Sequence, residues 1–202
     1  MDDEELQLIE WGFATMPLKG GDVSGDRYMI KPFRNGILMA VVDGLGHGSE
    51  AARASKTALD TLKTHAGEPI IPLVIRCHEA LKGTRGVVMT IASFNSLDKT
   101  MAWLGVGNVE VILLRDDGNV LSRKSPLLRG GVLGYQLPPL KETALPVKHG
   151  DTLIFATDGI RSGFEMGIKI SDKPQQIAER IMAQFARGTD DALVLVVRYI
   201  CE

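Results

Sequence analysis

The sequence predicts an α+β fold in which helices cover an antiparallel β core. Two observations point to it. The expected elements run as strands, two helices, several strands, one helix and a last strand, so they do not alternate as in a doubly wound parallel fold. Short turns also separate neighbouring strands. With 202 residues, 45% of them hydrophobic, the chain can form one substantial core, and we expect residues 1–202 to form a single domain.

The first clear element is a short apolar strand over residues 37–42, which ends at Asp43-Gly44. An apolar run bounded by a turn is typical of a buried strand. After a glycine-rich turn, a helix is expected over residues 49–62, because its first serine can act as a cap and several alanines follow. A second helix is expected over residues 71–82, where apolar residues recur at helical spacing. Two consecutive helices would therefore cover one face of a sheet.

The middle of the chain is rich in strand-forming residues and turns. We expect strands over residues 87–94, 101–106 and 109–114. The turns next to them would lie at Asn95 and Asp98, at Gly107-Asn108 and at Asp117-Gly118. Because tight turns of this kind join antiparallel neighbours, each strand should pair with the next.

The C-terminal part begins with the longest irregular stretch, residues 125–142, which is a candidate mobile loop. Beyond it we expect a strand over residues 152–157 that ends at Asp158-Gly159, a helix over residues 174–187 and a closing strand over residues 192–199. Three large aromatic residues lie in apolar, strand-like segments and are expected in the core: Trp11, Trp103 and Phe155.

Charge and composition exclude several classes of function. The net charge is −2, and the Lys and Arg residues are scattered, so neither nucleic acid nor an anionic membrane is an expected partner. The acidic N-terminus does not resemble a secretory signal, and no apolar run is long enough to span a bilayer. Cys77 and Cys201 belong to no CxxC pair or metal-ligand spacing. We expect a cytoplasmic protein whose cysteines are reduced and structurally ordinary.

Four acidic residues share one sequence context, because each lies at the end of a predicted strand beside small residues: Asp26, Asp43, Asp158 and Asp190. A single Asp-Gly pair is most often a turn, but carboxylates gathered in one place repel one another unless cations neutralise them. Oxygen ligands without a His or Cys cluster favour Mg²⁺ or Mn²⁺. Two such ions can bind a phosphoryl group and activate a water molecule. The pattern therefore indicates metal-dependent phosphoryl chemistry.

Two other phosphate-binding designs fit the sequence less well. Gly44, Gly46 and Gly48 follow a GxGxG spacing, whereas the dinucleotide-binding fingerprint requires GxGxxG. A phosphatase that forms an aspartyl-phosphate would need a second aspartate two residues after Asp43, where the chain has Leu45. The mechanism with metal and water is preferred.

The acidic blocks, taken in order, resemble the signatures of a known family. They are residues 24–26 (SGD), 43–48 (DGLGHG), 157–159 (TDG) and 190–191 (DD). Together with Arg85-Gly86 and residues 105–109 (GVGNV), they are similar to the metal-dependent protein phosphatases, the PPM or type 2C family. The finer resemblance is to the SpoIIE-like branch of that family, and within it to small stand-alone phosphatases of a stress-response pathway.

This resemblance implies a fold and an activity. The fold is a four-layer α-β-β-α sandwich, with two mostly antiparallel sheets flanked by helix pairs. The activity is that of a protein serine/threonine phosphatase with two Mn²⁺ or Mg²⁺ ions and metal-activated water. The implied substrates are phosphoserine and phosphothreonine on STAS-domain stress-signalling proteins of the stressosome type. The alternative is a non-catalytic phosphoprotein-binding module on the same fold.

The resemblance also assigns a role to each candidate metal ligand. Asp43 would bridge both ions, and the carbonyl of Gly44 would bind one of them. Asp158 and Asp190 would complete the coordination of the other. Asp26 would act directly or through metal-bound water. Asp26 and Asp43 are thus the residues expected to activate the catalytic water through the metal.

The remaining assignments are less direct. Larger members of the family have a histidine straight after their Asp-Gly, where this chain has Leu45. His47 is then a candidate general acid, although a role in shaping the turn is preferred. Neighbours on an extended chain point to opposite sides, so only one of the adjacent Asp190 and Asp191 can readily reach the same ions. The resemblance to the family implies that Asp190 is the ligand. The candidate phosphate-binding residues are Arg27, Arg85 and Arg161.

Overall fold

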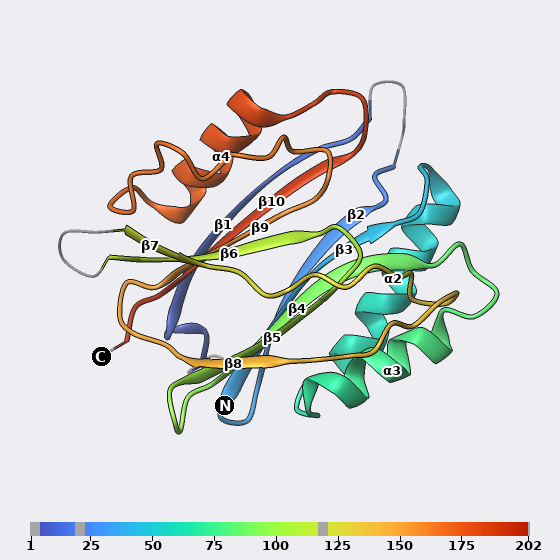
Figure 1. The fold of residues 1–202 in the computed structure, drawn as a ribbon, viewed down its shortest axis with the longest axis horizontal. Helices are drawn as coiled ribbons and strands as arrows, with labels where there is room; N and C mark the ends of the chain where they lie inside the picture. Colours follow the sequence, from blue (N-terminus) through green and yellow to red (C-terminus); the bar gives the residue numbers. More distant parts are fainter. Residues whose placement is uncertain (1–4, 19–22, 117–120, 202) are drawn as a thin grey trace.

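Two five-stranded antiparallel sheets face each other (Figure 1). The computed structural model describes residues 5–18, 23–116 and 121–201. The first sheet has the strand order β1-β10-β9-β6-β7, made of β1 (Ile9–Met16), β10 (Ala192–Tyr199), β9 (Thr152–Ala156), β6 (Glu110–Asp116) and β7 (Leu121–Lys124). The second has the order β2-β3-β4-β5-β8, made of β2 (Asp26–Phe33), β3 (Gly36–Gly44), β4 (Val87–Asn95), β5 (Thr100–Val106) and β8 (Thr143–Pro146).

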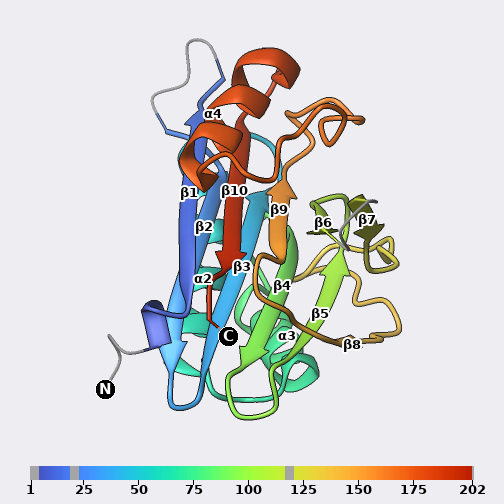
Figure 2. The same cartoon turned by 90° about the vertical axis from the view of Figure 1, so that its left-hand side faces the viewer.

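Helices cover the outer faces of the two sheets and complete four layers (Figures 1 and 2). α2 (Ser49–Thr64) and α3 (Ile70–Ala80) pack on the second sheet, and α4 (Pro174–Phe185) packs on β1 and β10 of the first. The predicted α+β sandwich is confirmed, but helix pairs flank it on one side only, because α4 is the single described helix on the other. None of the described helices combines the length and the apolar character that crossing a membrane requires.

The central strand β3 is buried on both of its faces, which explains its unbroken apolar sequence. Leu38, Ala40 and Val42 pack in the cluster beneath α2 and α3. Met39 and Val41 alternate with them and pack in the cluster between the sheets. Asp43 continues this second series, so its position on the strand directs its side chain toward the opposite sheet.

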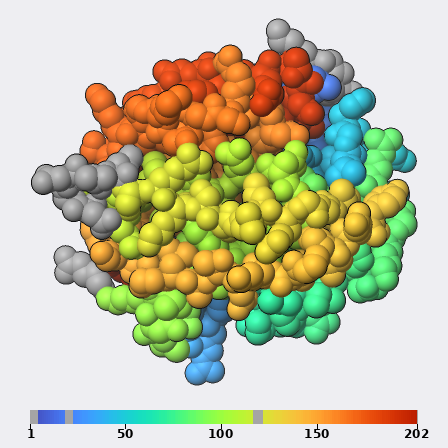
Figure 3. All heavy atoms as spheres, viewed as in Figure 1, coloured from blue at the N-terminus to red at the C-terminus, as the bar shows by residue number. Residues whose placement is uncertain are grey.

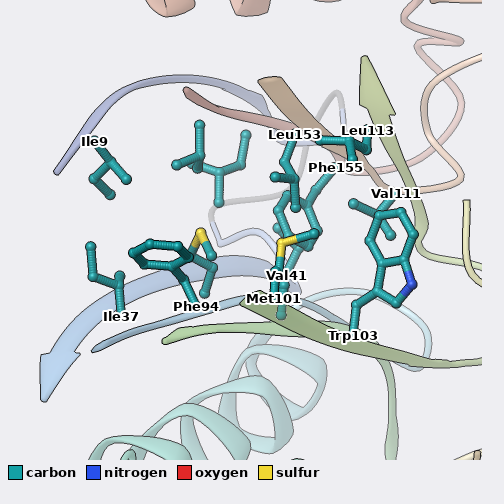
Figure 4. Packing of buried hydrophobic residues seen from close by; sticks show 14 of the residues in the cluster. Ile9, Ile37, Val41, Phe94, Met101, Trp103, Val111, Leu113, Leu153 and Phe155 are labelled. Carbon is teal, nitrogen blue, oxygen red and sulfur yellow. The ribbon is translucent and has the colours of Figure 1, made fainter. Parts of the chain in front are cut away.

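The space between the sheets is filled by side chains from both inner faces (Figure 4). Trp103 of β5 and Phe155 of β9 are buried there, as predicted. The prediction for Trp11 is wrong, because 43% of this side chain is exposed. β1 is an edge strand of its sheet, so an apolar residue there does not have neighbours on every side.

The predicted elements largely agree with the structure. The helices expected over residues 49–62, 71–82 and 174–187 are present, and the predicted strands are also present, each with ends shifted by at most two residues. Four strands had no predicted range: β1, β2, β7 and β8. The hairpin turn between β4 and β5 is confirmed, since Asn95 and Asp98 side chains accept hydrogen bonds from main-chain N–H groups of this turn. The predicted turn at Asp117-Gly118 lies outside the described residues.

One predicted strand pairing is wrong and matters for the site. The turn at Gly107-Asn108 does not close a hairpin, because β5 belongs to the second sheet and β6 to the first. Gly107 has a φ of 94°, and a Cβ added to it would lie 2.2 Å from the side chain of Val88. Turn residues indicate that a chain changes direction, but they do not indicate which sheet the next strand joins. The corner at Gly107-Asn108 thus carries the chain from one sheet to the other.

The irregular stretch over residues 125–142 is anchored to the rest of the fold. Leu133 is buried, and its main chain exchanges two hydrogen bonds with Val87, the first residue of β4. The N–H of Gly134 donates to Nδ1 of His78 on α3 (3.1 Å). Arg129 exchanges main-chain hydrogen bonds with the end of β5. This segment has little regular secondary structure, as predicted, but it is tied to β4, β5 and α3.

A buried ion pair lies at the end of β9 opposite to Asp158. Arg115 of β6 donates from Nε and Nη2 to both carboxylate oxygens of Asp151 (2.7 and 2.5 Å), and the two side chains are almost fully buried. Nη2 of Arg115 also donates to the carbonyl of Pro146 at the end of β8 (2.8 Å). The guanidinium group therefore joins the two sheets at this end of the sandwich.

Replacing Asp151→Asn should lower the free energy of unfolding by about 3–5 kcal/mol, because it leaves a buried guanidinium without its counter-charge. Urea unfolding followed by circular dichroism would measure this change. The control is Lys56→Ala, which breaks an exposed ion pair with Asp60 and should leave the midpoint nearly unchanged. Equal, small shifts of the urea midpoint in the two variants would contradict a stabilising role for the buried ion pair of Arg115 and Asp151.

Candidate active site

Four carboxylates gather at one end of the sandwich, and they come from both sheets. Asp26 begins β2, Asp43 lies near the end of β3, and the two residues are direct partners across these strands. Asp158 follows β9, and Asp190 precedes the neighbouring antiparallel strand β10. Asp43, Asp158 and Asp190 line one open cavity of about 570 Å³, and Asp26 is buried beside Asp43 with 6% of its surface exposed. The structure therefore brings together the four aspartates that the sequence singled out.

Glycines beside two of the aspartates allow other parts of the chain to pass very close. A Cβ added to Gly44 would lie 2.3 Å from the carbonyl oxygen of Ala51 on α2. A Cβ added to Gly159 would lie 2.0 Å from the carbonyl oxygen of Asp191. Neither contact can accommodate a side chain. The Asp-Gly pairs are thus explained by close packing around the site as well as by turn formation.

Thr157 connects the two sheets within the site. Its hydroxyl donates to Oδ2 of Asp26 (2.7 Å), and it accepts a hydrogen bond from the N–H of Leu193 (2.9 Å). Thr157 and Leu193 belong to the first sheet region, and Asp26 belongs to the second. This chain of hydrogen bonds fixes the buried carboxylate of Asp26. Sequence reasoning treated Thr157 only as part of a strand and of a family block.

Asn108 holds the carboxylate of Asp158 and was missed as a functional residue. Its Nδ2 donates to Oδ2 of Asp158 (2.8 Å). Nε of Arg187 donates to the main-chain carbonyl of the same residue (2.9 Å). Asn108 lies at the corner between the sheets, where the sequence predicts a hairpin turn. The block at residues 105–109 was noticed as a resemblance, but a single sequence gave no reason to place its asparagine next to Asp158.

The adjacent Asp190 and Asp191 have different surroundings. Asp190 is exposed and lines the cavity. Asp191 is buried, and its carboxylate accepts hydrogen bonds from the N–H groups of Leu18 (2.8 Å) and Gly25 (2.7 Å). Asp191 therefore ties the chain around β1 and β2 to the start of β10. The predicted separation of the two side chains agrees with these positions.

Burial and mutual repulsion make two of the carboxylates reluctant to ionise. Burial, and to a smaller extent the nearby charges of Asp26, Asp158 and Asp190, raise the pKa of Asp43 to about 8. Burial likewise raises the pKa of Asp26 to about 7, although the hydrogen bond from Thr157 opposes the shift. Ionised, these groups would be stabilised by a cation placed among them.

The donor set suits hard divalent cations, although the side chains do not form a closed coordination shell as they stand. Among the described residues, no three His, Cys, Asp or Glu side chains are spaced to coordinate one ion together. Carboxylate oxygens are nonetheless the donors that Mg²⁺ or Mn²⁺ prefers, and here they come from both sheets. Burial and like charge raise the pKa of two of these carboxyl groups, Asp26 and Asp43. Coordination by Asp26, Asp43, Gly44, Asp158 and Asp190 stays a prediction.

His47 and the three candidate arginines have distinct positions. His47 is exposed and lines the same cavity as Asp43. Arg27 alternates with Asp26 on β2, on the face where Met29 packs beneath α2, so it points away from the carboxylates. Arg161 donates to the carbonyls of Gln184 and Phe185 at the end of α4.

Arg85 is the candidate arginine that lies near the carboxylate cavity. A Cβ added to Gly46, which lines that cavity, would lie 2.8 Å from Nη1 of Arg85. Nε of Arg85 pairs with Glu50 at the start of α2 (2.6 Å). The structure thus places one of the three candidate arginines beside the site.

Replacing Asp191→Ala should lower the free energy of unfolding by about 2 kcal/mol or more, because two main-chain N–H groups lose their acceptor. The matched control is Asp190→Ala, which also removes one negative charge but only one hydrogen bond, from the adjacent N–H of Asp191. Thermal unfolding without added metal would compare the two variants. Equal losses would contradict the structural role of Asp191.

Replacing Asp43→Asn should raise the melting temperature of the metal-free protein by a few degrees, since about 1 kcal/mol of relieved repulsion corresponds to about 2–4 °C for a domain of this size. Saturating Mn²⁺ should stabilise the wild-type chain, because a ligand that binds only the folded state does so, and should stabilise the variant much less. Differential scanning fluorimetry with Mn²⁺ and with EDTA measures both effects. The exposed Glu142→Gln variant controls for the loss of one charge. An unchanged Mn²⁺ response in Asp43→Asn would contradict the metal site.

The chain is similar to known proteins over most of its length. The sequence profile described as Stage II sporulation protein E (SpoIIE) matches residues 34–200. Phosphoserine phosphatase RsbX of Bacillus subtilis (strain 168) is 29% identical over 174 residues, which cover 84% of this chain and 86% of RsbX. The match includes most of both proteins, so the similarity is not confined to a short motif.

Two solved structures share the whole architecture. A structure described under "The bacterial stressosome: a modular system that has been adapted to control secondary messenger signaling" superposes with a TM-score of 0.85 at 28% identity, covering 94% of this chain and 99% of that one. The structure of RsbX in complex with magnesium superposes with a TM-score of 0.85 at 24% identity, covering 95% of each chain. The four-layer sandwich is thus shared over nearly the full length.

Proposed function

The chain belongs to the SpoIIE family, and we propose that it removes phosphate from phosphoserine or phosphothreonine of STAS-domain stress-signalling proteins in the cytoplasm, with Mn²⁺ or Mg²⁺ as cofactor. The chain is a protein serine/threonine phosphatase, as its match to a phosphoserine phosphatase over most of both lengths indicates. The observation that carries the mechanism is the convergence of Asp43, Asp158 and Asp190 on one cavity, with Asp26 buried beside them.

Four residues of the chain would hold the cations, and others would support them. Asp43, the carbonyl of Gly44, Asp158 and Asp190 would hold the cations, and Asp26 would contribute directly or through water. When bound, the cations lower the pKa of a coordinated water and neutralise charge on the phosphoryl group. Asn108 keeps the carboxylate of Asp158 in position.

Two further residues have proposed roles: Thr157 would position the buried carboxylate of Asp26, and His47 would act on the substrate. Thr157 keeps the carboxylate of Asp26 in position by donating a hydrogen bond to it. His47, exposed at the same cavity, is the candidate to donate a proton to the departing serine or threonine oxygen.

The proposed substrate is supported by the relatives and by the shape of the site. One relative is named a phosphoserine phosphatase, and one structural neighbour is described in the context of the bacterial stressosome. The cavity is open to the surface, and its volume of about 570 Å³ is large enough for a phosphorylated side chain. A STAS-domain phosphoprotein is the substrate that the family resemblance implies.

The test is hydrolysis of p-nitrophenyl phosphate and of a phosphoserine STAS-domain protein, with Mn²⁺, with Mg²⁺ and with EDTA. We expect turnover with metal, none with EDTA, and a preference for the protein substrate. Asp43→Asn should lower kcat/KM at least about a hundredfold, because losing even an outer partner of a metal ligand costs about 10- to 100-fold. His47→Ala should cost less than Asp43→Asn, and up to about a hundredfold if His47 is the general acid.

Circular dichroism of Asp43→Asn provides the control, because the variant should retain the fold. Full activity of this variant would overturn the mechanism. Binding of the phosphoprotein without hydrolysis in either metal would instead favour a phosphoprotein-binding module. Hydrolysis of p-nitrophenyl phosphate with no hydrolysis of the STAS-domain protein would keep the enzyme and reject the substrate.

A further inference from the structure

A second cavity adjoins the carboxylate cavity at the surface. It has a volume of about 680 Å³ and shares Leu45, Gly46 and Val132 with the first. Its remaining walls include Arg85 and Tyr135. Figure 3 shows the segment that follows β7, in yellow and orange, running across this face of the molecule. We call the second cavity the flanking groove, because it continues the depression that leads to the carboxylates.

The wall of the flanking groove is held in place by main-chain hydrogen bonds. Leu133 and Val87 exchange N–H···O bonds of 2.9 and 3.1 Å. Val132 and Gln136 also exchange N–H···O bonds, of 3.0 and 2.9 Å, and close a tight turn. Tyr135 lies at the tip of this turn with 72% of its surface exposed. A surface that is already ordered loses little conformational entropy when it binds a ligand.

The chemistry of the groove suits a polypeptide with apolar and acidic side chains. Leu45, Val132 and the ring of Tyr135 offer apolar surface. Within the described part of the chain, Arg85 is the one Lys or Arg that lines either cavity. Its ion pair with Glu50 is exposed on both sides, with side chains 48% and 58% accessible. Exposed pairs contribute little stability, so an acidic ligand can compete with Glu50 for the guanidinium group.

We propose that the flanking groove binds the residues next to the phosphorylated serine of the protein substrate, with an apolar side chain against Leu45, Val132 and Tyr135 and an acidic side chain at Arg85. A phosphoserine that reaches Asp43 must place its neighbouring residues on a surface that adjoins the cavity, and the groove shares a wall with that cavity. This inference rests on the proposed phosphatase function. It makes Tyr135 and Arg85 specificity-determining residues. A small phosphate ester such as p-nitrophenyl phosphate does not need Tyr135, which lines the groove but not the carboxylate cavity.

The test uses phosphoserine peptides of equal length that differ only beside the phosphoserine. The first has leucine and glutamate beside the phosphoserine, the second has leucine and lysine, and the third has alanine at both of these positions. The wild-type chain should prefer the Leu/Glu peptide over the alanine peptide by about tenfold in kcat/KM, as one buried anchor residue can provide. Tyr135→Ala should remove most of this preference, mainly through KM. Arg85→Glu should reverse the order of the glutamate and lysine peptides.

The ratio of peptide to p-nitrophenyl phosphate hydrolysis separates recognition from chemistry, and it should fall about tenfold in Tyr135→Ala. Leu127→Ala is the matched control, because Leu127 is equally exposed on the same segment (70%) but lines neither cavity. It should leave the ratio unchanged. No flanking preference in the wild-type chain, or an equal loss on all substrates in Tyr135→Ala, would overturn the proposal.

Binding measurements keep this inference distinguishable from the proposed function. Fluorescence anisotropy with labelled versions of the same peptides reports the groove even if nothing is hydrolysed. The wild-type chain could bind the peptides without hydrolysing them, and Tyr135→Ala could weaken that binding. This result would reject the phosphatase function but support the groove as a peptide-binding site. A wild-type dimer that Tyr135→Ala dissociates in sedimentation experiments would assign the groove to a second copy of the chain and overturn the proposal.

Discussion

The structure depends on keeping several carboxylates together at one end of a β sandwich. Asp26 and Asp43 face each other across paired strands, and both are largely removed from water. Burial of a carboxylate and the proximity of others both oppose ionisation, which the raised pKa values of these residues reflect. Such an arrangement weakens the fold unless something positive offsets it. Clustered, buried aspartates are therefore better explained by a function that needs them than by stability.

Much of the surrounding structure serves to hold this unfavourable arrangement. The backbone of α2 passes directly over Gly44, where no side chain would fit. Thr157 joins Asp26 to the first sheet, and Asp191 accepts two main-chain hydrogen bonds that tie the chain before β2 to β10. The hydrogen bonds of Thr157 and Asp191 link residues more than a hundred positions apart in the sequence. The site is thus produced by the meeting of the two sheets, and neither sheet alone contains it.

The sequence predicted the elements of the fold well, because periodic apolar patterns and turn residues are local signals. It also singled out the four aspartates, since each lies at or next to the end of a strand beside small residues. It failed at Trp11, because an edge strand and a central strand have similar sequences. It failed at Gly107-Asn108, because a turn signal does not tell whether the next strand joins the same sheet. Contacts of Thr157, Asn108 and Asp191 depend on the tertiary arrangement, which no single local pattern encodes.

The corner at Gly107-Asn108 shows why the wrong strand pairing and the missed site residue are one problem. A hairpin there would have left Asn108 at the tip of a solvent-exposed turn. Because the chain instead crosses to the other sheet, Asn108 arrives beside Asp158 and donates a hydrogen bond to its carboxylate. Arg129 forms main-chain hydrogen bonds with Gly105 and Gly107 at this corner and lies at the start of the segment that leads to the flanking groove. The corner therefore adjoins both a partner of a candidate metal ligand and the segment that forms the flanking groove, so the proposed metal site and the proposed substrate surface meet at one point of the fold.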